Sequence, residues 1–173
     1  MSTFQSNLDI ANLEFNKTLQ VELQAYFKAT QKTIVFLDMF TKGLLTQLSS
    51  HYVSEELNYG TIISNSAHSF VNLLKAPTDL FKSPPTKSFA QDSAEFICKK
   101  FNTDIGVSIS GIQGFSNSSN NIMAKVYLGY SFKNEKNARI IQCNGSAKNN
   151  SEQIVHGVFG YLKMMFQKYT KTN

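Results

Sequence analysis

The side chains best suited to chemistry are Asp38, Thr41 and His68, which supply an acid, a hydroxyl and an imidazole that titrates near neutral pH. Together they could form the acid, nucleophile and base of a hydrolase. Asp38 and Thr41 follow the apolar run at 33–37, so one turn between a strand and a helix would hold both. A threonine at the start of a helix is, however, more often a cap than a nucleophile. Capping and catalysis are therefore competing interpretations of Thr41.

The sequence contains no pattern that indicates a metal ion or another cofactor. The histidines lie on separate predicted elements and lack the spacing of metal ligands; they are His51, His68 and His156. Cys98 and Cys143 are far apart and fit neither a zinc cluster nor a C-x-x-C motif, so we expect reduced thiols. The stretch 113–121 lacks the glycine and lysine pattern of a P-loop. We therefore expect no metal site and no cofactor.

The net charge of +5 could suggest nucleic acid, but the distribution of the cations argues against it. The 17 Lys and Arg residues are spread along the chain, and Arg139 is the only arginine. Base recognition and phosphate clamps favour arginine, whereas scattered lysines are typical of a solvated surface. Nucleic-acid binding is therefore not expected.

The chain also lacks the sequence features of secretion and of membrane insertion. Nothing near its start resembles a signal peptide, and no apolar stretch approaches the roughly 20 residues of a membrane-spanning helix. We expect no membrane association and an intracellular, cytoplasmic protein, with a nuclear location left open.

Hydrophobic periodicity predicts helices and strands that alternate along the chain. The segment 33–37 is β-branched and almost wholly apolar, as expected of a strand covered on both faces. The expected helices are 6–29 with Ser6 as its cap, 41–50, 65–74, the segment from Pro85 to 101, and 151–170. The expected strands are 33–37, 55–64, 104–111, 123–132 and 138–143, with a polar loop at 112–121.

These elements predict an α/β fold, specifically a three-layer α/β/α sandwich with a mixed sheet. The sheet is mixed because the last two strands flank a polar turn at 133–137 and form a hairpin. Helices must cover both faces of the sheet, and we expect one domain over 1–173. In such folds ligands bind outside the carboxyl ends of strands. Three segments meet that description, namely 38–43, 64–68 and 110–121.

In their order and spacing these segments resemble the CinA C-terminal domain family, the nicotinamide-nucleotide amidases. The family has a turn like E-S-C-T-G-G, a Y-S-N-x-x-K segment, and a G-I-A-G-P loop followed by a strand beginning P-V-G-T-V. The corresponding runs here are D-M-F-T-K-G at 38–43, I-S-N-S-A-H at 63–68, S-G-I-Q-G-F at 110–115 and I-M-A-K-V at 122–126. The resemblance covers nearly the whole chain and is strongest over 33–130. It implies the CinA-C-like fold.

The same resemblance implies that the family's reaction is lost. The family's serine nucleophile corresponds to Met39, which has no proton to lose. The tyrosine and lysine that would help to activate the serine correspond to Ile63 and His68. We therefore expect no catalytic residues and a non-catalytic pseudo-amidase domain that serves as a protein-binding or scaffold module. Its expected partner is another copy of the chain or a different protein in a complex.

Two other functions stay open at this point. One is a hydrolase that deamidates a pyridine nucleotide such as nicotinamide mononucleotide, with Asp38, Thr41 and His68 as its catalytic residues. The other is a nucleotide-binding sensor without turnover. By the resemblance, the residues that would bind a ligand are Asp38, Met39, Thr41, Gly43, Ser64, Asn65, Ser110, Gly111, Gln113 and Gly114.

Overall fold

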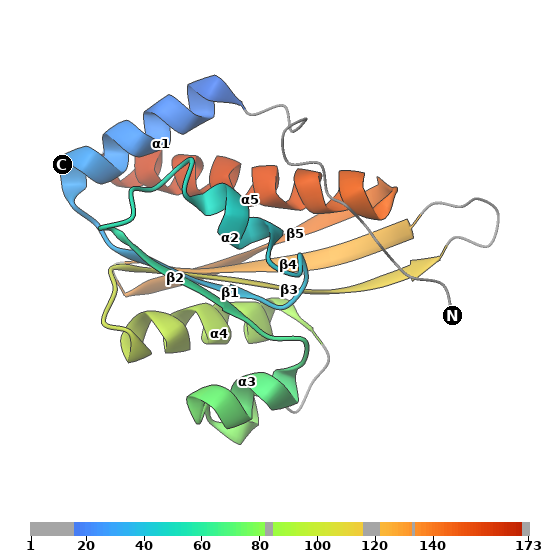
Figure 1. Cartoon of the computed structure of the whole chain (residues 1–173). Helices are drawn as coiled ribbons and strands as arrows, with labels where there is room; N and C mark the ends of the chain where they lie inside the picture. Colours follow the sequence, from blue (N-terminus) through green and yellow to red (C-terminus); the bar gives the residue numbers. More distant parts are fainter. Residues whose placement is uncertain (1–15, 82–84, 116–121, 133, 171–173) are drawn as a thin grey trace.

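The computed structural model of the chain describes residues 16–81, 85–115, 122–132 and 134–170. Its strands are β1 (Ile34–Asp38), β2 (Asn58–Ile63), β3 (Ile105–Phe115), β4 (Ile122–Phe132) and β5 (Glu135–Gly145). They form one sheet in the order β2-β1-β3-β4-β5 (Figure 1). β1 pairs in parallel with β2 and β3, whereas β4 is antiparallel to β3 and to β5. The sheet is therefore mixed, and the predicted hairpin is present.

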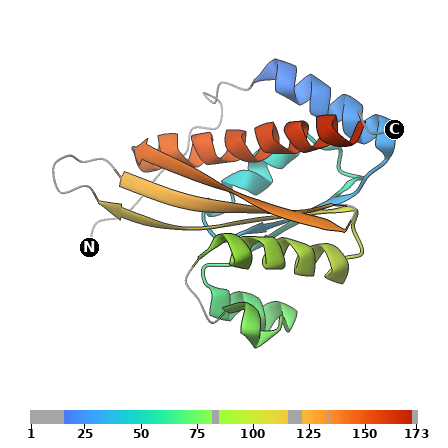
Figure 2. The same ribbon diagram turned by 180° about the vertical axis from the view of Figure 1, so that it is seen from behind.

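Helices cover both faces of this sheet. They are α1 (Lys17–Thr30), α2 (Leu44–Ser49), α3 (Ala67–Leu74), α4 (Lys87–Lys100), α5 (Ala147–Thr170) and the short 3-10 helix η2 (Thr78–Phe81). α1, α2 and α5 lie on one side of the sheet and α3 and α4 on the other, as the two opposite views show (Figures 1 and 2). The predicted α/β/α sandwich with a mixed sheet is confirmed.

β1 is apolar from Ile34 to Leu37 because both of its faces are covered. Ile34 and Phe36 belong to the large core cluster beneath α1, α2 and α5, where the Phe36 ring lies 6.0 Å from that of Phe159. Val35 and Leu37 point to the opposite cluster beneath α3 and α4. Every residue of β1 is buried, so the strand that carries the predicted site ends inside the protein rather than on its surface.

α4 lies unusually close to the backbone of the sheet. A Cβ on Gly129 of β4 would fall 1.8 Å from the Ala90 carbonyl oxygen, so only glycine fits there. The hydroxyl of Ser108 on β3 donates to the same carbonyl at 2.7 Å. These contacts hold α4 across β3 and β4.

β3 and β4 extend further than the sequence indicated. The prediction of a loop at 112–121 is wrong for 112–115, which continue β3 and pair with residues 122–125 of β4. Residues 116–121 lie outside the described residues. The glycines and polar residues of this stretch are typical of a loop, but the partner strand supplies hydrogen bonds that local composition does not reveal.

Other predicted boundaries differ by a few residues. α1 begins at Lys17 behind an Asn16 cap, and the predicted first part of that helix, with Ser6, lies outside the described residues. Residues 55–57, predicted as the start of the second strand, form a turn. The helix predicted from residue 41 begins only at Leu44, after the turn that follows β1. The corrected bounds are 44–49 for α2, 58–63 for β2, 135–145 for β5 and 147–170 for α5. Among the described residues, no helix combines the length and apolarity that crossing a membrane requires.

Candidate functional site

Asp38 ends β1 and organises the turn that leads into α2. Its side chain is buried, and its two carboxylate oxygens accept hydrogen bonds from the turn itself. Oδ1 accepts from the amides of Phe40 (3.0 Å) and Thr41 (2.7 Å), and Oδ2 accepts from the amide of Gly43 (2.9 Å) and the hydroxyl of Thr41. The carboxylate is thus surrounded by donors from its own loop, an arrangement that stabilises a buried charge.

Thr41 completes the turn by capping α2. Its hydroxyl donates to Asp38 and accepts from the amide of Leu45 at 3.1 Å, and only 5% of the residue is exposed. Gly43 then takes φ +98°, and a Cβ there would lie 3.3 Å from the Ile63 side chain. The capping interpretation of Thr41 is therefore confirmed by its hydrogen bonds.

Met39 and Phe40 project from the same turn into apolar surroundings. Met39 packs against the cluster of Val35, Leu37 and Phe70, and its amide donates to the Ile109 carbonyl at 2.9 Å. Phe40 packs against the large cluster on the other side of the sheet. The position that corresponds to the family's nucleophile is consequently filled by a thioether in contact with the core.

The second predicted segment contacts the turn through its backbone. The Ser64 amide donates to the Asp38 carbonyl at 3.0 Å, and the buried Ser64 hydroxyl donates to the Ser66 carbonyl at 2.8 Å. Asn65 is exposed, and so is His68 on α3, whose Nε2 lies 2.9 Å from the Asn72 amide nitrogen. His68 is therefore engaged on its own helix, and the described hydrogen bonds do not link it to Asp38 or Thr41.

The residues of the third predicted segment, 110–121, do not all lie near the turn. Ser110 is buried beside the turn, and its hydroxyl has no hydrogen-bond partner within the described part of the chain. A Cβ on Gly111 would lie 3.0 Å from the Phe40 ring. Gln113 and Gly114 are exposed and pair with β4, whereas the pairing of β1 with β3 ends at Ile109. At about 3.3 Å per residue, these two lie roughly 13 Å or more beyond the turn along the strand.

The two cysteines are free and buried, as the sequence led us to expect. Burial raises the pKa of the Cys98 thiol, and its Sγ donates to the Thr103 carbonyl at 3.0 Å. Burial also raises the pKa of Cys143. Neither is therefore an activated thiolate. Within the described ranges, no group of three or more His, Cys, Asp or Glu side chains is arranged to hold a metal ion.

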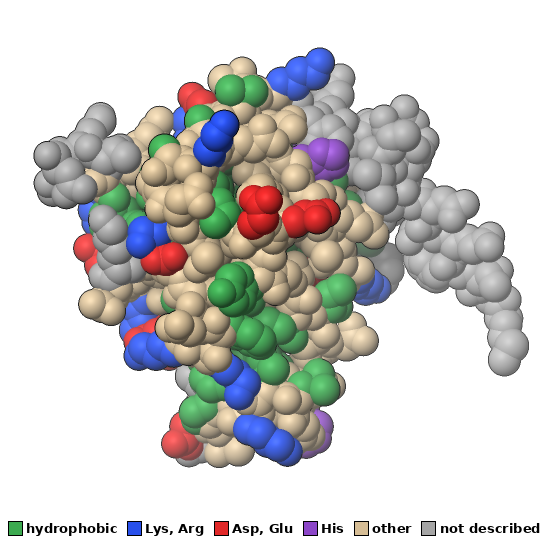
Figure 3. Space-filling model, turned by 60° about the vertical axis from the view of Figure 1, so that its left-hand side comes forward, with side chains coloured by type: hydrophobic (Ala, Val, Ile, Leu, Met, Phe, Trp, Pro, Cys, Tyr) green, Lys and Arg blue, Asp and Glu red, His purple; other side chains and the backbone are tan. Residues whose placement is uncertain are grey.

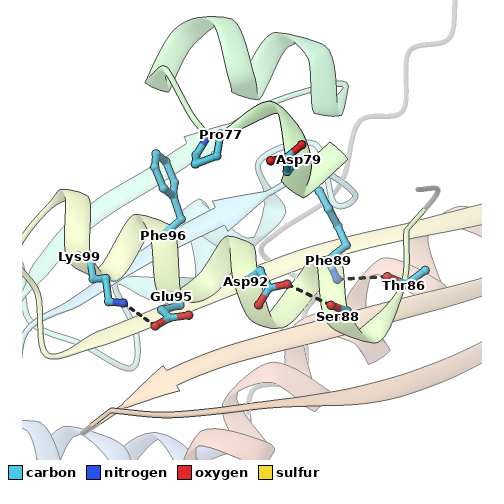
Figure 4. Close-up of a pocket in the computed structure, with 9 residues that line it drawn as sticks. All are labelled: Pro77, Asp79, Thr86, Ser88, Phe89, Asp92, Glu95, Phe96 and Lys99. Carbon is cyan, nitrogen blue, oxygen red and sulfur yellow. Dashed lines mark hydrogen bonds and ion pairs between the residues drawn. The ribbon is translucent and has the colours of Figure 1, made fainter. Parts of the chain in front are cut away.

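A pocket of about 480 Å³ opens elsewhere, between α4 and the segment that precedes it (Figure 4). Its lining residues are Pro77, Asp79, Thr86, Ser88, Phe89, Asp92, Glu95, Phe96 and Lys99. The carboxylates on its α4 side already have partners: Lys99 pairs with Glu95 at 2.6 Å, and Ser88 donates to Asp92 at 3.0 Å. None of the predicted ligand-binding residues lines this pocket. The spacing of its polar residues along α4 could have indicated a polar helix face, but not a cavity.

Comparisons with known proteins agree on one family. A sequence model of the CinA C-terminal domain matches residues 16–166. A competence or damage-inducible protein from Enterobacter asburiae has a similar crystal structure, with a TM-score of 0.72 and 17% identity over 86% of this chain and 96% of that one. A CinA superfamily protein from Klebsiella pneumoniae has a TM-score of 0.75 and 15% sequence identity, and the match covers 87% of this chain and 97% of that one. The competence/damage inducible protein CihA from Agrobacterium tumefaciens has a TM-score of 0.62 and 14% sequence identity, and the match covers 96% of this chain and 99% of that one. No curated protein matches the sequence.

Proposed function

Since this chain belongs to the CinA C-terminal domain family, we propose that it is a non-catalytic member that acts as a protein-binding or scaffold module. The observation that carries the proposal is that the buried polar side chains of the β1–α2 turn, Asp38 and Thr41, are both engaged in holding the turn together. Asp38 and Thr41 bond to each other and to the turn's backbone, and Met39 stands where the family has its serine. The module would be the whole chain, 1–173.

The chemistry of amide hydrolysis supports this proposal. Acyl transfer through an enzyme hydroxyl needs an exposed oxygen that a neighbouring base can deprotonate. The Thr41 hydroxyl already donates its proton to Asp38 and accepts from Leu45, and it is nearly inaccessible. Met39 offers only a thioether. The turn therefore lacks a hydroxyl or thiol that is open to a substrate.

The activating groups are absent from the matched positions as well. The position of the family's tyrosine is Ile63, an apolar residue with 48% of its surface exposed above the turn. The position of the lysine is His68, which is exposed and pairs with Asn72. Neither residue reaches the Thr41 hydroxyl in the described hydrogen-bond network.

The direct test is to incubate the purified chain with nicotinamide mononucleotide and to measure released ammonia, with a catalytically competent family member as the positive control. We expect the rate to equal that of a protein-free blank. Ammonia release that persists in Thr41→Ser and disappears in Thr41→Val would instead assign the hydrolase function. Thr41→Ser keeps the hydroxyl, and Thr41→Val keeps the size of the side chain but loses the hydrogen bonds to Asp38 and Leu45. The melting temperature of both variants is therefore measured beside the ammonia, so that a loss of chemistry is told apart from a loss of folding.

The sensor alternative is distinguished by binding rather than by turnover. Nicotinamide mononucleotide at millimolar concentration should leave the melting temperature of the chain unchanged, because Met39 and Phe40 occupy the turn. A saturable increase without ammonia release would replace the scaffold function by a nucleotide sensor. We place the module in the cytoplasm as part of the proposal; the free thiols of Cys98 and Cys143 are in keeping with a reducing compartment.

A further inference from the structure

A second pocket, of about 330 Å³, lies between β5 and the C-terminal half of α5, which runs along that strand (Figure 2). Its volume is at the lower end of the range of small-molecule sites. None of the ligand-binding residues predicted from the sequence lines it. Its residue Arg139 lies three strands from Asp38 in the same row of the sheet, which is roughly 14 Å at the usual spacing of strands. The pocket is therefore separate from the β1–α2 turn.

Arg139, the only arginine of the chain, is held at this pocket by an aromatic ring. Its guanidinium carbon lies 5.0 Å from the centre of the Tyr161 ring, within the range of a cation–π contact. Tyr161 in turn packs against the fully buried Tyr130, with ring centres 4.5 Å apart. Within the described part of the chain, the guanidinium forms no ion pair and no hydrogen bond. Its planar set of N–H donors is thus positioned but unused.

Asn137 supplies a second donor on the same side of the sheet. Asn137 and Arg139 are two residues apart on β5, so their side chains leave the same face of the strand. The side-chain oxygen of Asn137 accepts from the Ala138 amide at 2.8 Å, whereas its NH₂ group has no acceptor among the described residues. Both side chains line the pocket with donors that are available to a ligand.

The charges that line the pocket leave one positive charge uncompensated. Glu135, the only acid among the described lining residues, accepts from the Tyr169 hydroxyl at 2.5 Å and pairs with Lys168 at 3.3 Å. The ammonium of Lys136 is engaged by two carboxylates of α4, on the opposite side of the sheet. The remaining charge is that of Arg139. A monoanion would neutralise it, whereas a dianion would add a negative charge near Glu135.

The α5 side of the pocket is apolar. Met164 is 58% exposed, and its neighbour Met165 packs against the large core cluster. Methionine side chains are flexible and polarisable, so they adapt to apolar groups of different shapes. The pocket thus combines an unpaired cation with an adaptable apolar surface.

Other cations of the chain are more dispersed. On the face shown in Figure 3, Lys and Arg side chains lie singly or beside acidic side chains, and they do not gather into one patch. Lys125 of β4 also lies over an aromatic ring, 5.6 Å from the centre of the Tyr127 ring. Because Arg139 pairs with Leu128, three residues further along β4, Lys125 points to the opposite face of the sheet. Lys125 is therefore a matched control for Arg139.

We propose that the pocket between β5 and α5 binds an organic carboxylate with an apolar body. Arg139 and Asn137 hold the carboxylate, and Met164 and Met165 contact the apolar part. The arginine fork matches the two oxygens of a carboxylate, which explains why one arginine suffices. The inference goes beyond the proposed scaffold function and does not depend on it, because the pocket shares no residue with the β1–α2 turn.

An NMR titration of the isotope-labelled full chain with benzoate tests the site. We expect saturable shifts at millimolar benzoate for the amides of residues 137–139 and 161–168. Acetate lacks the apolar body, benzyl alcohol lacks the charge and phenyl phosphate is a dianion, so each should bind at least about tenfold more weakly. Shifts that do not saturate, or that map to other residues, would overturn the inference. Equal affinity for acetate or benzyl alcohol, or tighter binding of phenyl phosphate, would do so as well.

Substitution of Arg139 tests the residue that carries the inference. Arg139→Gln should raise the dissociation constant for benzoate at least about tenfold, because the charge and the fork are both lost. Arg139→Lys keeps the charge without the fork and should give an intermediate value. The control Lys125→Gln makes the same change of charge at the other cation–aromatic contact and should leave the constant unchanged. Since Arg139 is exposed, the amide spectra of its variants should otherwise match that of the wild type. Equal constants for Arg139→Gln and the wild type would contradict the proposed site.

This inference and the proposed function fail in different experiments. Ammonia release from nicotinamide mononucleotide would overturn the non-catalytic function and leave the binding of benzoate as it is. A chain that neither binds benzoate nor releases ammonia would lose the carboxylate site alone.

Discussion

Asp38 is a buried acid whose hydrogen bonds give it a structural role. Three amides and one hydroxyl of its own turn donate to it, so the charge is stabilised by the loop that it holds in place. Such a network is worth more than its parts, because losing the acceptor leaves several buried donors without a partner. The residue therefore holds the β1–α2 connection together in the folded state.

We expect Asp38→Asn to destabilise the chain strongly. The asparagine NH₂ group cannot accept, so it would face donors such as the Gly43 amide or the Thr41 hydroxyl. The free energy of unfolding should fall by about 3 kcal/mol, as measured by urea denaturation. Glu56→Gln, on the exposed turn before β2, is the matched control and should change it little. Equal effects of the two variants would contradict this account of Asp38.

The sequence was informative at this scale where side chain and backbone are neighbours. A carboxylate and a hydroxyl just before a helix predict caps, and Thr41 does accept from the Leu45 amide in the first turn of α2. Asp38 instead binds amides of the turn that precedes the helix. The catalytic alternative required His68 as well, and its place depends on how α3 packs. The contact with Asn72, four residues along the same helix, follows from helical periodicity, but only tertiary structure could reveal that His68 does not bond to Asp38 or Thr41.

Among the elements, β1 was the most predictable and β3 the least. The apolar run of β1 is typical of a central strand in a sheet that is covered by helices on both faces. The outer part of β3 contains Gly111, Gln113 and Gly114, and its strand conformation depends on their partners in β4, Val126, Ala124 and Met123. The α4 pocket could not be predicted from sequence for a similar reason, because contacts around it join residues far apart in the chain. Lys136 of β5, for example, pairs with Asp92 and Glu95 of α4.

The strands β1 and β3 are also joined at their first residues by a titratable group. Asp104 accepts from the Thr33 amide at 2.9 Å and the Thr33 hydroxyl at 3.0 Å, and it pairs with Lys32 at 2.5 Å. Partial burial raises the pKa of the Asp104 carboxyl, but the bonds from Lys32 and Thr33 outweigh it and lower the pKa below its usual value near 3.8.

This lowered pKa predicts acid sensitivity of the β1–β3 junction. A depressed carboxyl pKa stabilises the fold above the unfolded value and ceases to do so as pH falls through the folded one. The free energy of unfolding should therefore fall between about pH 5 and pH 3, and less steeply in Asp104→Asn than in the wild type. Denaturant titrations at the two pH values measure the difference. Identical slopes for both proteins would show that Asp104 does not contribute.

For the whole molecule, stability should be highest at the centre of the sheet and lowest at α3. β1 and the first half of β3 are buried and have strands on both sides. In α3, Phe70 is buried while residues such as His68 and Leu73 are exposed. This gradient follows from the order of the strands, which composition alone does not determine.

Amide hydrogen exchange measures this gradient. We expect amides of β1, β3 and β4 to exchange most slowly and those of α3 first, because opening α3 uncovers little apolar surface. Protection of α3 equal to that of β3 would contradict the gradient.

Different side chains of the β1–α2 turn have different structural roles, and protein engineers can use this difference. Asp38, Thr41 and Gly43 hold the backbone, whereas Met39 and Phe40 only fill space beside it. Combinatorial libraries at positions 39 and 40, extended to the neighbouring positions 63 and 68, should therefore yield mostly folded proteins. Directed evolution from this chain would begin with a turn whose backbone is already held in place by Asp38, Thr41 and Gly43.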